Sequence, residues 1–322
     1  MFSLAHKPLG PVVPPKISVI LPTYNRRTIL PRTIASVIGQ DEPDFELIVI
    51  DDCSTDDTAA YLDSLDDPRI RVLRPQRNLG TAGARNFGLA EARAEFIALL
   101  DDDDVYFSHR LSTPLAIFAR KSDVVATLSS SIKLDRKRTQ YVFMPELTLP
   151  PASFEWALIC DLIGVEGTGI TVRRQAALDA GGFHTGMKWI DDREFLIRVA
   201  RVGSGHLIAE PLWQKYWSDD GQSNQWDQAG LSLLSYVAAR PELRGRYRKL
   251  GSYLATKILV SDLRHGLIGA LVRDLRAFRR ARLIDGNPVR MWRDHREVHH
   301  YRRVMSSHDA LATLPHAPEQ WC

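Results

Sequence analysis

Four consecutive aspartates, at positions 101–104, follow directly after an apolar run at 96–100 that is typical of a buried strand. Carboxylates two residues apart in a turn can point to the same side and share a hard divalent cation, Mn²⁺ or Mg²⁺, whose other ligands would be water and substrate phosphate oxygens. A solvated acidic turn and the negatively charged start of a helix are the alternatives. Because four adjacent carboxylates repel one another without a cation, the sequence favours a metal site.

A second acidic pair, Asp51 and Asp52, ends another apolar run at 45–50. An aspartate at the end of a strand can accept hydrogen bonds from a ribose or a base, or it can cap the next helix. With residues 101–104 the pair also matches a phospho-accepting receiver domain, but such a domain would leave roughly 200 residues unexplained. A dinucleotide site is disfavoured because no GxGxxG sequence follows the first expected strand.

The elements expected around these residues alternate between strand and helix. The sequence predicts strands at 17–21, 45–50, 70–73 and 96–100, and helices at 29–40, 54–65 and 82–92. This alternation indicates βαβ units and an α/β fold with a mostly parallel sheet. Ligands of such sheets bind beyond the carboxyl ends of the strands, so one crevice should gather residues 23–25, 51–52 and 101–104.

Four ordered segments, spread over about ninety residues, closely resemble the signature of glycosyltransferase family 2. They are ISVILPTYNR at 17–26, ELIVIDDCSTDDT at 46–58, NLGTAGARN at 78–86 and FIALLDDDD at 96–104. A looser match continues through GGF at 181–183 and WIDDREF at 189–195. The resemblance implies a GT-A-type fold, with a mostly parallel sheet flanked by helices, a nucleotide-sugar donor and inverting chemistry.

Carried over residue by residue, the resemblance implies a set of nucleotide-sugar-binding residues: Pro22, Thr23, Tyr24, Asn25, Asp51, Asp52, Arg85, Asn86, Asp101 and Asp102. Within this set, Thr23 and Tyr24 would line the nucleobase pocket. Asp52 would hold the base or the ribose, with Asp51 beside it. Arg85 and Asn86 would flank the nucleotide.

The resemblance also implies the metal ligands and the catalytic acids. Asp101 and Asp103 would form a D-x-D element, with Asp103 the direct ligand of Mn²⁺ or Mg²⁺. Asp192 matches the general base of the family, and Asp191 stands beside it where a glutamate is usual. The chemistry suits these residue types, since a cation stabilises the charge of a departing nucleoside diphosphate and a carboxylate can take a proton from the acceptor hydroxyl. A helix N-terminus is the alternative for the acidic pair, and both readings can hold together.

Composition and charge divide the chain. With 322 residues it suits two cores, and 44% hydrophobic and 25% charged residues exclude a disordered or collagen-like chain. We expect a proline-rich tail, a nucleotide-sugar-binding half, an acceptor-binding half and a helical basic region, at 1–16, 17–125, 126–230 and 231–322. The net charge of +3 hides an asymmetry, because residues 240–303 carry 17 lysines and arginines against six acidic residues.

The basic C-terminal region has two readings that the sequence leaves open. Its alternating apolar and cationic residues suit a peripheral contact with an anionic membrane, where a lipid-linked acceptor would be found, or helices that pack on the catalytic part with a solvated basic face. Nucleic acid is disfavoured, since no recognised motif is present. Three widely spaced cysteines and an N-terminus that resembles neither a signal peptide nor a membrane span predict a cytoplasmic location, free or peripheral at the inner face of the membrane.

The sequence therefore predicts an inverting glycosyltransferase that moves a single sugar from a nucleoside-diphosphate sugar, UDP-linked in the favoured reading, to a glycan or lipid-linked acceptor in cell-surface polysaccharide assembly. The Gln-x-x-Arg-Trp element of processive relatives is missing, which favours single-sugar transfer. A GDP- or dTDP-sugar donor and a polyprenyl-phosphate acceptor stay open as alternatives. A catalytically silent nucleotide-binding or receiver-like protein is the alternative outside this class.

Overall fold

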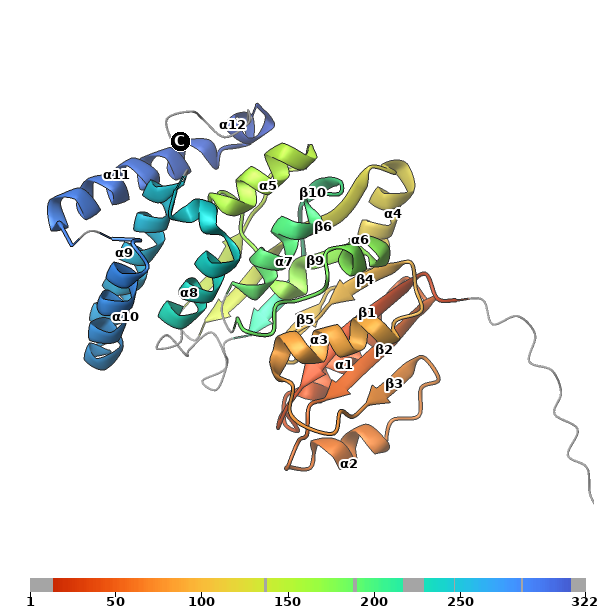
Figure 1. Ribbon diagram of the computed structural model, residues 1–322. Coiled ribbons are helices and arrows are strands. Elements are labelled where there is room, and N and C mark those ends of the chain that lie inside the picture. Colours follow the sequence, from red (N-terminus) through yellow and green to blue (C-terminus); the bar gives the residue numbers. More distant parts are fainter. Residues whose placement is uncertain are drawn as a thin grey trace, which may run out of the picture.

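The computed structural model describes residues 14–135, 138–187, 190–216, 229–245, 247–284 and 286–313. In this part of the chain ten strands form one sheet, with helices packed around it (Figure 1). The strands are β1 (Ile17–Thr23), β2 (Phe45–Asp51), β3 (Ile70–Leu73), β4 (Phe96–Leu99), β5 (Asp104–Tyr106), β6 (Val124–Asp135), β7 (Arg138–Val142), β8 (Leu147–Leu149), β9 (Ile170–Arg173) and β10 (Ser204–Tyr216).

The helices fall into an N-terminal and a C-terminal group. The first group is α1 (Leu30–Ile38), α2 (Thr58–Asp63), α3 (Gly80–Glu91), α4 (Ser112–Arg120), α5 (Pro151–Ile159), α6 (Arg174–Asp179) and α7 (Asp191–Val199), with a short 3-10 turn η1 (Gly167–Gly169). The second is α8 (Ala229–Ala239), η4 (Pro241–Leu243), α9 (Arg248–Arg264), α10 (Ile268–Arg280), α11 (Pro288–Met305) and α12 (His308–Ala312). Among the described residues, no helix combines the length and apolar character that crossing a membrane requires.

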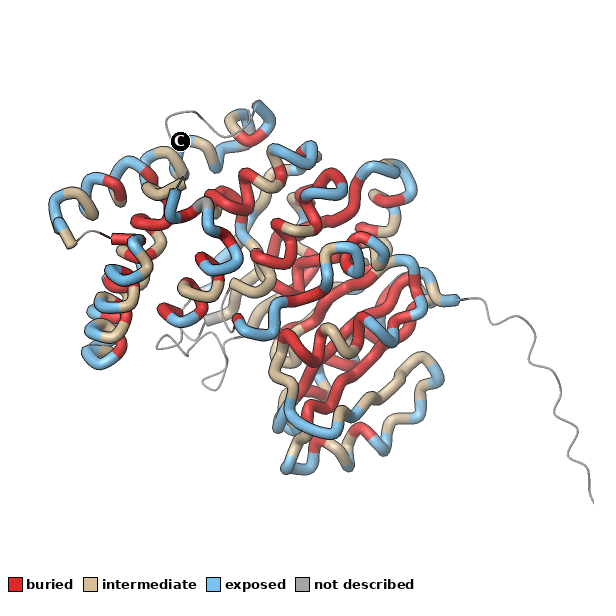
Figure 2. The backbone as a smooth tube through the Cα atoms, in the orientation of Figure 1, coloured by how far each residue is buried: buried red, intermediate tan, exposed pale blue. Residues whose placement is uncertain are grey.

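The sheet is mostly parallel, as predicted. Along the path β3-β2-β1-β4-β9-β6-β10-β5, six strands run in one direction, and only β9 and β5 run against them. The predicted strands at 17–21, 45–50, 70–73 and 96–100 correspond to β1 to β4. Every residue of β1 and β2 is buried, because both faces of a parallel sheet are covered (Figure 2).

Strand register brings the polar strand ends together. In the parallel pairs, Thr23 of β1 lies opposite Asp51 of β2, and Ile20 lies opposite Leu99 of β4. The residues that follow β4 therefore emerge beside the end of β1. The ends of β1, β2 and β4 meet at one edge of the sheet, as predicted, but not every residue of 23–25, 51–52 and 101–104 faces a common cavity.

Helix α3 is fixed to the sheet at both its start and its middle. At its start, the Asp52 carboxylate accepts hydrogen bonds from the backbone N–H groups of Leu79 (2.7 Å) and Gly80 (2.8 Å). In its middle, a Cβ at Gly88 would lie 2.8 Å from side-chain atoms of Ile20 and Ile50, so only glycine lets the helix approach the strands this closely. These two contacts fix α3 relative to the strand ends. They therefore also fix the residues of α3 that lie between Gly80 and Gly88.

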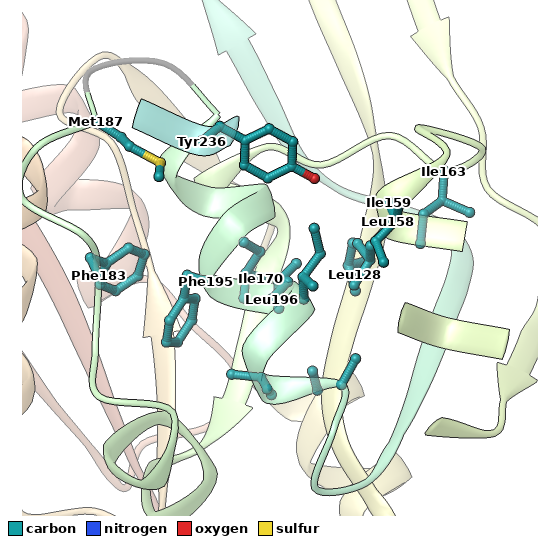
Figure 3. Close-up of a cluster of buried hydrophobic side chains, with 14 of the residues drawn as sticks. Leu128, Leu158, Ile159, Ile163, Ile170, Phe183, Met187, Phe195, Leu196 and Tyr236 are labelled. Atoms are coloured by element: carbon teal, nitrogen blue, oxygen red, sulfur yellow. The ribbon is translucent and has the colours of Figure 1, made fainter. Parts of the chain in front are cut away.

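Helix α7 packs into the main core. Its buried residues include Phe195, Leu196 and Val199, and Figure 3 shows Phe195 and Leu196 among side chains from neighbouring strands and helices. The ring of Phe195 stacks on that of Phe183, with centroids 4.1 Å apart. Each such buried side chain contributes about 1.5–3 kcal/mol, which fixes the axis of the helix and so the position of its first residues.

The C-terminal helices pack against the rest of the protein, on the side away from β1 to β3 (Figure 1). The indole Nε1 of Trp156 on α5 donates a hydrogen bond to the hydroxyl of Tyr301 on α11 (3.1 Å). Nε of Arg302 donates to the backbone carbonyl of Asp161 (3.0 Å). The predicted helical character of this region is confirmed, and α8 is its first described helix.

The division of the chain into a tail, two halves and a C-terminal region stays a prediction. Residues 1–13 of the expected tail lie outside the described residues. The expected boundary at residue 125 falls inside β6, a strand of the common sheet.

Candidate active site

A cavity of about 620 Å³ lies beyond the carboxyl ends of β1 and β4. One side is formed by the ends of the first strands and the start of α3, with Pro22, Thr23, Tyr24, Arg26, Asp52 and Thr81. The opposite side comes from α5, the chain after it, α8 and α9, with Ile159, Asp161, Val165, Tyr236, Leu254 and Lys257. Between them lie the ionisable residues Arg85, Asp101, Asp102, Asp103, Glu166, Asp191, Asp192, Arg193 and Lys215, together with Ile190.

The centre of the cavity is organised by one buried arginine. Nη2 of Arg85 lies 2.7 Å from Oδ1 of Asp101, and Nη1 lies 2.5 Å from Oδ1 of Asp192 and 3.2 Å from Oδ2 of Asp191. Burial lowers the pKa of the Arg85 guanidinium, but the three carboxylates raise it by more, so the arginine stays charged. A single cation thus joins the acidic run after β4 to the acidic start of α7.

The backbone of η1 covers this arginine at close range. A Cβ at Gly167 would lie 2.5 Å from Nη2 of Arg85 and 3.2 Å from Oδ2 of Asp192, so a residue with a side chain would displace the ion pairs. The next residue, Thr168, accepts a hydrogen bond from the backbone N–H of Asp101 (3.1 Å) and donates one to Oδ2 of Asp104 (2.5 Å). The turn therefore holds the guanidinium and the acidic run together.

Asp192, the expected general base, has a pKa that its surroundings shift. Burial raises the pKa of its carboxyl group to about 7, with Arg85 opposing the rise and Asp191 and Asp101 adding to it. Burial also raises the pKa of Asp191. A base with a pKa close to the working pH combines a substantial ionised fraction with the strength to accept a proton. Both aspartates follow Ile190, which adopts a left-handed backbone (φ 61°) at the start of α7.

The four aspartates after β4 differ in environment. Asp104 is fully buried, and burial raises its pKa well above the usual value. It lies opposite Lys215 in the β5–β10 pair. Burial lowers the pKa of the Lys215 amine, but Asp104 and Asp101 raise it by more, so the lysine stays charged. Burial and the neighbouring Asp103 raise the pKa of Asp102 to about 7.

The remaining two carboxylates suit a hard divalent cation. Asp101 and Asp103 both line the cavity and offer oxygen atoms, the donor type that Mn²⁺ and Mg²⁺ prefer. Helix α1 holds this turn, because Oγ1 of Thr33 donates to the Asp102 carbonyl (2.9 Å) and Nη2 of Arg32 to the Asp103 carbonyl (3.2 Å). In the described part of the chain, no three acidic, histidine or cysteine side chains are grouped to hold a metal on their own. The residues fit a cation whose coordination is completed by water and by the phosphates of a donor.

Three of the expected nucleotide-binding residues do not line the cavity. They instead hold the segments around it in place. Oδ1 of Asp51 accepts a hydrogen bond from the backbone N–H of Ser54 (3.0 Å). Oδ1 of Asn25, which has a left-handed backbone (φ 54°), accepts one from the backbone N–H of Thr55 (2.7 Å). This contact holds the loop before α2, so that helix begins at Thr58 and not at the expected residue 54.

Asn86 has a similar structural position. Its side chain donates to the backbone carbonyl of Phe183 (2.8 Å) and accepts from the backbone N–H of the same residue (2.7 Å). The pair joins α3 to the segment that precedes α7. Trp189, in the looser sequence match, lies outside the described residues.

Sequence reasoning missed part of the lining: Arg26, Thr81, Ile159, Asp161, Val165, Glu166, Ile190, Arg193, Lys215, Tyr236, Leu254 and Lys257. Four of these had a usable signal, because they lie within the segments that match the family: Arg26, Thr81, Ile190 and Arg193. The others come from segments without a motif, and packing alone brings them to the cavity.

Comparison with known proteins gives a family assignment. The sequence profile described as Glycosyl transferase family 2 matches residues 18–182. The succinoglycan biosynthesis protein ExoO of Rhizobium meliloti is 33% identical over 144 residues, which make up 42% of this chain and 41% of that protein. The GalNAc(5)-diNAcBac-PP-undecaprenol beta-1,3-glucosyltransferase of Campylobacter jejuni is 46% identical over 102 residues, 31% of this chain and 33% of that protein. The chain thus spans less than half the length of these two curated relatives.

Solved structures share the fold at low sequence identity. S. aureus TarS 1-349, in complex with UDP-GlcNAc, has a TM-score of 0.60 at 18% identity and covers 90% of this chain and 92% of its own. The mannosyltransferase PcManGT of Pyrobaculum calidifontis, in complex with GDP-Man and Mn²⁺, has a TM-score of 0.54 at 20% identity and covers 93% of this chain and 89% of its own. These likenesses confirm the predicted GT-A-type fold. Since the profile covers half of the sequence, the chain belongs to glycosyl transferase family 2.

Proposed function

We propose that this protein is an inverting, metal-dependent glycosyltransferase that transfers one sugar from a UDP-sugar to a lipid-linked or glycan acceptor in cell-surface polysaccharide assembly. The observation that carries the proposal is the position of Arg85. It joins the candidate metal ligand Asp101 to the candidate base Asp192 within one cavity. The cation site and the base therefore lie between a side suited to a nucleotide and an opposite side open to an acceptor.

The donor side uses the residues at the ends of the first strands. Thr23 and Tyr24 would contact the nucleobase, and Tyr24 is 47% exposed and so available for stacking. Asp52 lines the same side while it caps α3, so it can accept a hydrogen bond from a ribose without moving. The complexes of TarS with UDP-GlcNAc and of PcManGT with GDP-Man support a nucleotide-sugar donor, because both proteins have the same fold.

Asp101 and Asp103 would hold Mn²⁺ or Mg²⁺. When bound, the cation would stabilise the negative charge of the departing nucleoside diphosphate. The complex of PcManGT with Mn²⁺ supports this assignment. Arg85 keeps Asp101 in place by its ion pair and adds fixed positive charge next to the leaving group.

The acceptor hydroxyl would lose its proton to the Asp192 carboxylate as it attacks the sugar. Attack from the side opposite the leaving diphosphate in a single displacement inverts the anomeric centre. Asp191 shares the Nη1 group of Arg85 with Asp192, so it positions the guanidinium and, through it, the base. Holding both substrates in line removes much of the entropic barrier.

A lipid-linked acceptor is supported by the relative from Campylobacter jejuni, whose name gives a sugar chain on PP-undecaprenol as its acceptor. The turn between α9 and α10 suits a peripheral contact with an anionic membrane. The helix ends that flank it expose Val260, Leu263 and Ile268, and Leu263 is 61% exposed. Arg264, next to Leu263, and Arg276, on α10, are also exposed. Apolar side chains can enter the headgroup layer while the arginines contact anionic lipids.

A thermal-shift screen with UDP, GDP, dTDP, CDP and ADP, each with and without Mn²⁺, tests the donor site. A ligand that binds only the folded state raises the melting temperature, by an amount that grows with the logarithm of the ratio of its concentration to its dissociation constant. UDP should stabilise the protein only with the metal, and Asp103→Ala should lose this shift. Asp66→Ala, at an exposed aspartate outside the cavity, is the matched control. If no nucleotide shifts the wild type, or if Asp103→Ala keeps the full shift, the donor and metal assignments are wrong.

A further inference from the structure

The acceptor side of the cavity contains charges that sugar transfer itself does not require. We propose that Lys257, with Arg193 and Arg302 behind it, binds the diphosphate of a lipid diphosphate acceptor. This inference rests on the proposed function and assigns part of the acceptor to a place in the cavity.

Positive charge is in excess around Asp161. Its Oδ1 lies 2.5 Å from Nη2 of Arg193, its Oδ2 pairs with Nη2 of Arg302, and Nζ of Lys257 lies 3.6 Å from Oδ2. Burial raises the pKa of the Asp161 carboxyl, but the three cations lower it by more, so the carboxylate stays ionised. One negative charge thus faces three positive ones among the described side chains. Glu166, which also lines the cavity, is paired with Lys133.

The three cations differ in how firmly they are held. Arg193 also donates to the carbonyls of Leu158 (2.9 Å) and Ile163 (3.2 Å), so its guanidinium closes the end of α5. Arg302 donates to the Asp161 carbonyl and to the hydroxyl of Tyr253. Both arginines are therefore fixed in place.

Lys257 is the cation that can contact a ligand. Its side chain is 57% exposed, its single acidic neighbour lies at a long 3.6 Å, and it lines the cavity. An ammonium group carries three donors, so most of its capacity remains for an anion. The two fixed arginines strengthen the positive field at this point.

The surroundings of Lys257 suit a lipid diphosphate. Ile159, Val165 and Leu254 line the same side of the cavity, so an apolar surface adjoins the cation. Lys257 and Leu263 lie on the same helix, six residues apart, which is roughly 9 Å along its axis and about 120° around it. A lipid whose chain lies at the exposed end of α9 would therefore pass around the helix to place its diphosphate at Lys257 and its sugar toward Asp192.

The test measures binding of phenoxyundecyl diphosphate to the full chain by calorimetry, with saturating UDP and Mn²⁺ to occupy the donor side. Phenoxyundecanol and inorganic pyrophosphate are the comparison ligands. The wild type should bind the lipid diphosphate at least about tenfold more tightly than either, and Lys257→Gln should lower that affinity about tenfold. Lys257→Arg should retain it.

Lys249→Gln is the matched control, because Lys249 lies on the same helix, pairs with Glu297 and does not line the cavity. It should bind like the wild type. Equal affinities for the lipid alcohol and the lipid diphosphate, or unchanged binding by Lys257→Gln, would overturn the assignment. Pyrophosphate that binds as tightly as the lipid form would show a site for a free anion and overturn it too.

The thermal shift with UDP and Mn²⁺, recorded on the same samples, separates this assignment from the proposed function. A wild type without that shift contradicts the transferase proposal, whereas a normal shift with no preference for the lipid diphosphate contradicts only the assignment of Lys257. The melting temperature of Lys257→Gln without ligands should match that of the wild type, because the side chain is largely exposed.

Discussion

The guanidinium of Arg85 donates to the carboxylate of Asp192, with Nη1 and Oδ1 2.5 Å apart. The same arginine contacts Asp101 from the run after β4. Asp101 and Asp192, more than ninety positions apart in the sequence, are therefore held by one side chain. A change at either carboxylate should alter the position of Arg85 and so affect the other carboxylate.

Asp192→Asn should abolish transfer while leaving nucleotide binding nearly intact. The amide keeps the shape of the side chain but cannot take a proton, and loss of a general base costs about 10²–10⁴-fold in rate. The measurements are kcat with the best acceptor and the thermal shift with UDP and Mn²⁺. Asp66→Asn should match the wild type in both. Loss of the UDP shift in Asp192→Asn would mean that this residue binds the donor.

The rate should depend on pH through Asp192, whose pKa burial raises to about 7. Only the ionised base accepts a proton, so kcat should fall about tenfold per unit below pH 7 and level off above it. The measurement is kcat from about pH 5.5 to about pH 8.5 with all substrates saturating. Asp102→Asn is the control, since burial raises the pKa of Asp102 to about 7 as well, and its profile should keep the same midpoint. A flat wild-type profile contradicts the assignment.

Arg85→Met should destabilise the fold by about 3–5 kcal/mol at pH 8, because it leaves buried carboxylates without their cation. The pKa of Asp192 and that of Asp191 are both raised, so these groups take up protons as the pH falls. The loss of stability should therefore be smaller at pH 6. Denaturant unfolding at both values measures this, with Arg77→Met, at an exposed arginine, as the control. An equal loss at both pH values would show that packing, and not charge, holds Arg85.

Gly88→Ala should destabilise the protein by about 1–3 kcal/mol, because its Cβ would lie 2.8 Å from Ile20 and Ile50. Gly269→Ala, in α10, is the matched control, since no atom lies within 4 Å of the added Cβ. It should stabilise by about 0.4–1 kcal/mol through the lower entropy of the unfolded chain. Chemical denaturation separates the two, and a neutral Gly88→Ala would show that α3 can move away from the sheet.

Leu263→Ser with Ile268→Ser should weaken binding to vesicles of phosphatidylglycerol and phosphatidylcholine by about tenfold, since each removes an exposed apolar side chain from the α9–α10 turn. Val202→Ser, at an exposed valine after α7, is the control. Vesicle sedimentation at low and high salt gives the measurement, and salt should weaken the wild-type interaction. A wild type that ignores these vesicles contradicts the membrane contact.

The sheet and the donor side were predictable because local signals specify them. Asp52 and Asp101 follow apolar runs of strand length, and parallel pairing brings such ends to one edge. The exact partners were not predictable. Asp51 and Asp52 are neighbours of identical type, yet alternation along the chain directs Asp52 to α3 and the cavity and Asp51 to the loop before α2.

The acceptor side could not be predicted, because tertiary packing alone creates it. Tyr236 and Lys257 reach the cavity from α8 and α9, which carry no motif. The excess of positive charge in the C-terminal region was visible in the sequence. The contact between Arg302 and Asp161 was not, because Asp161 lies about 140 positions before Arg302.

The residues that line the cavity fall into two groups along the sequence. Among the described lining residues, those of the donor side and the acidic run lie at or before Asp103, and the others lie at or after Ile159. A recombination between two family members in the intervening stretch would join the proposed donor side of one parent to the proposed acceptor side of the other. Because no described lining residue lies between the two groups, such an exchange would keep each group intact.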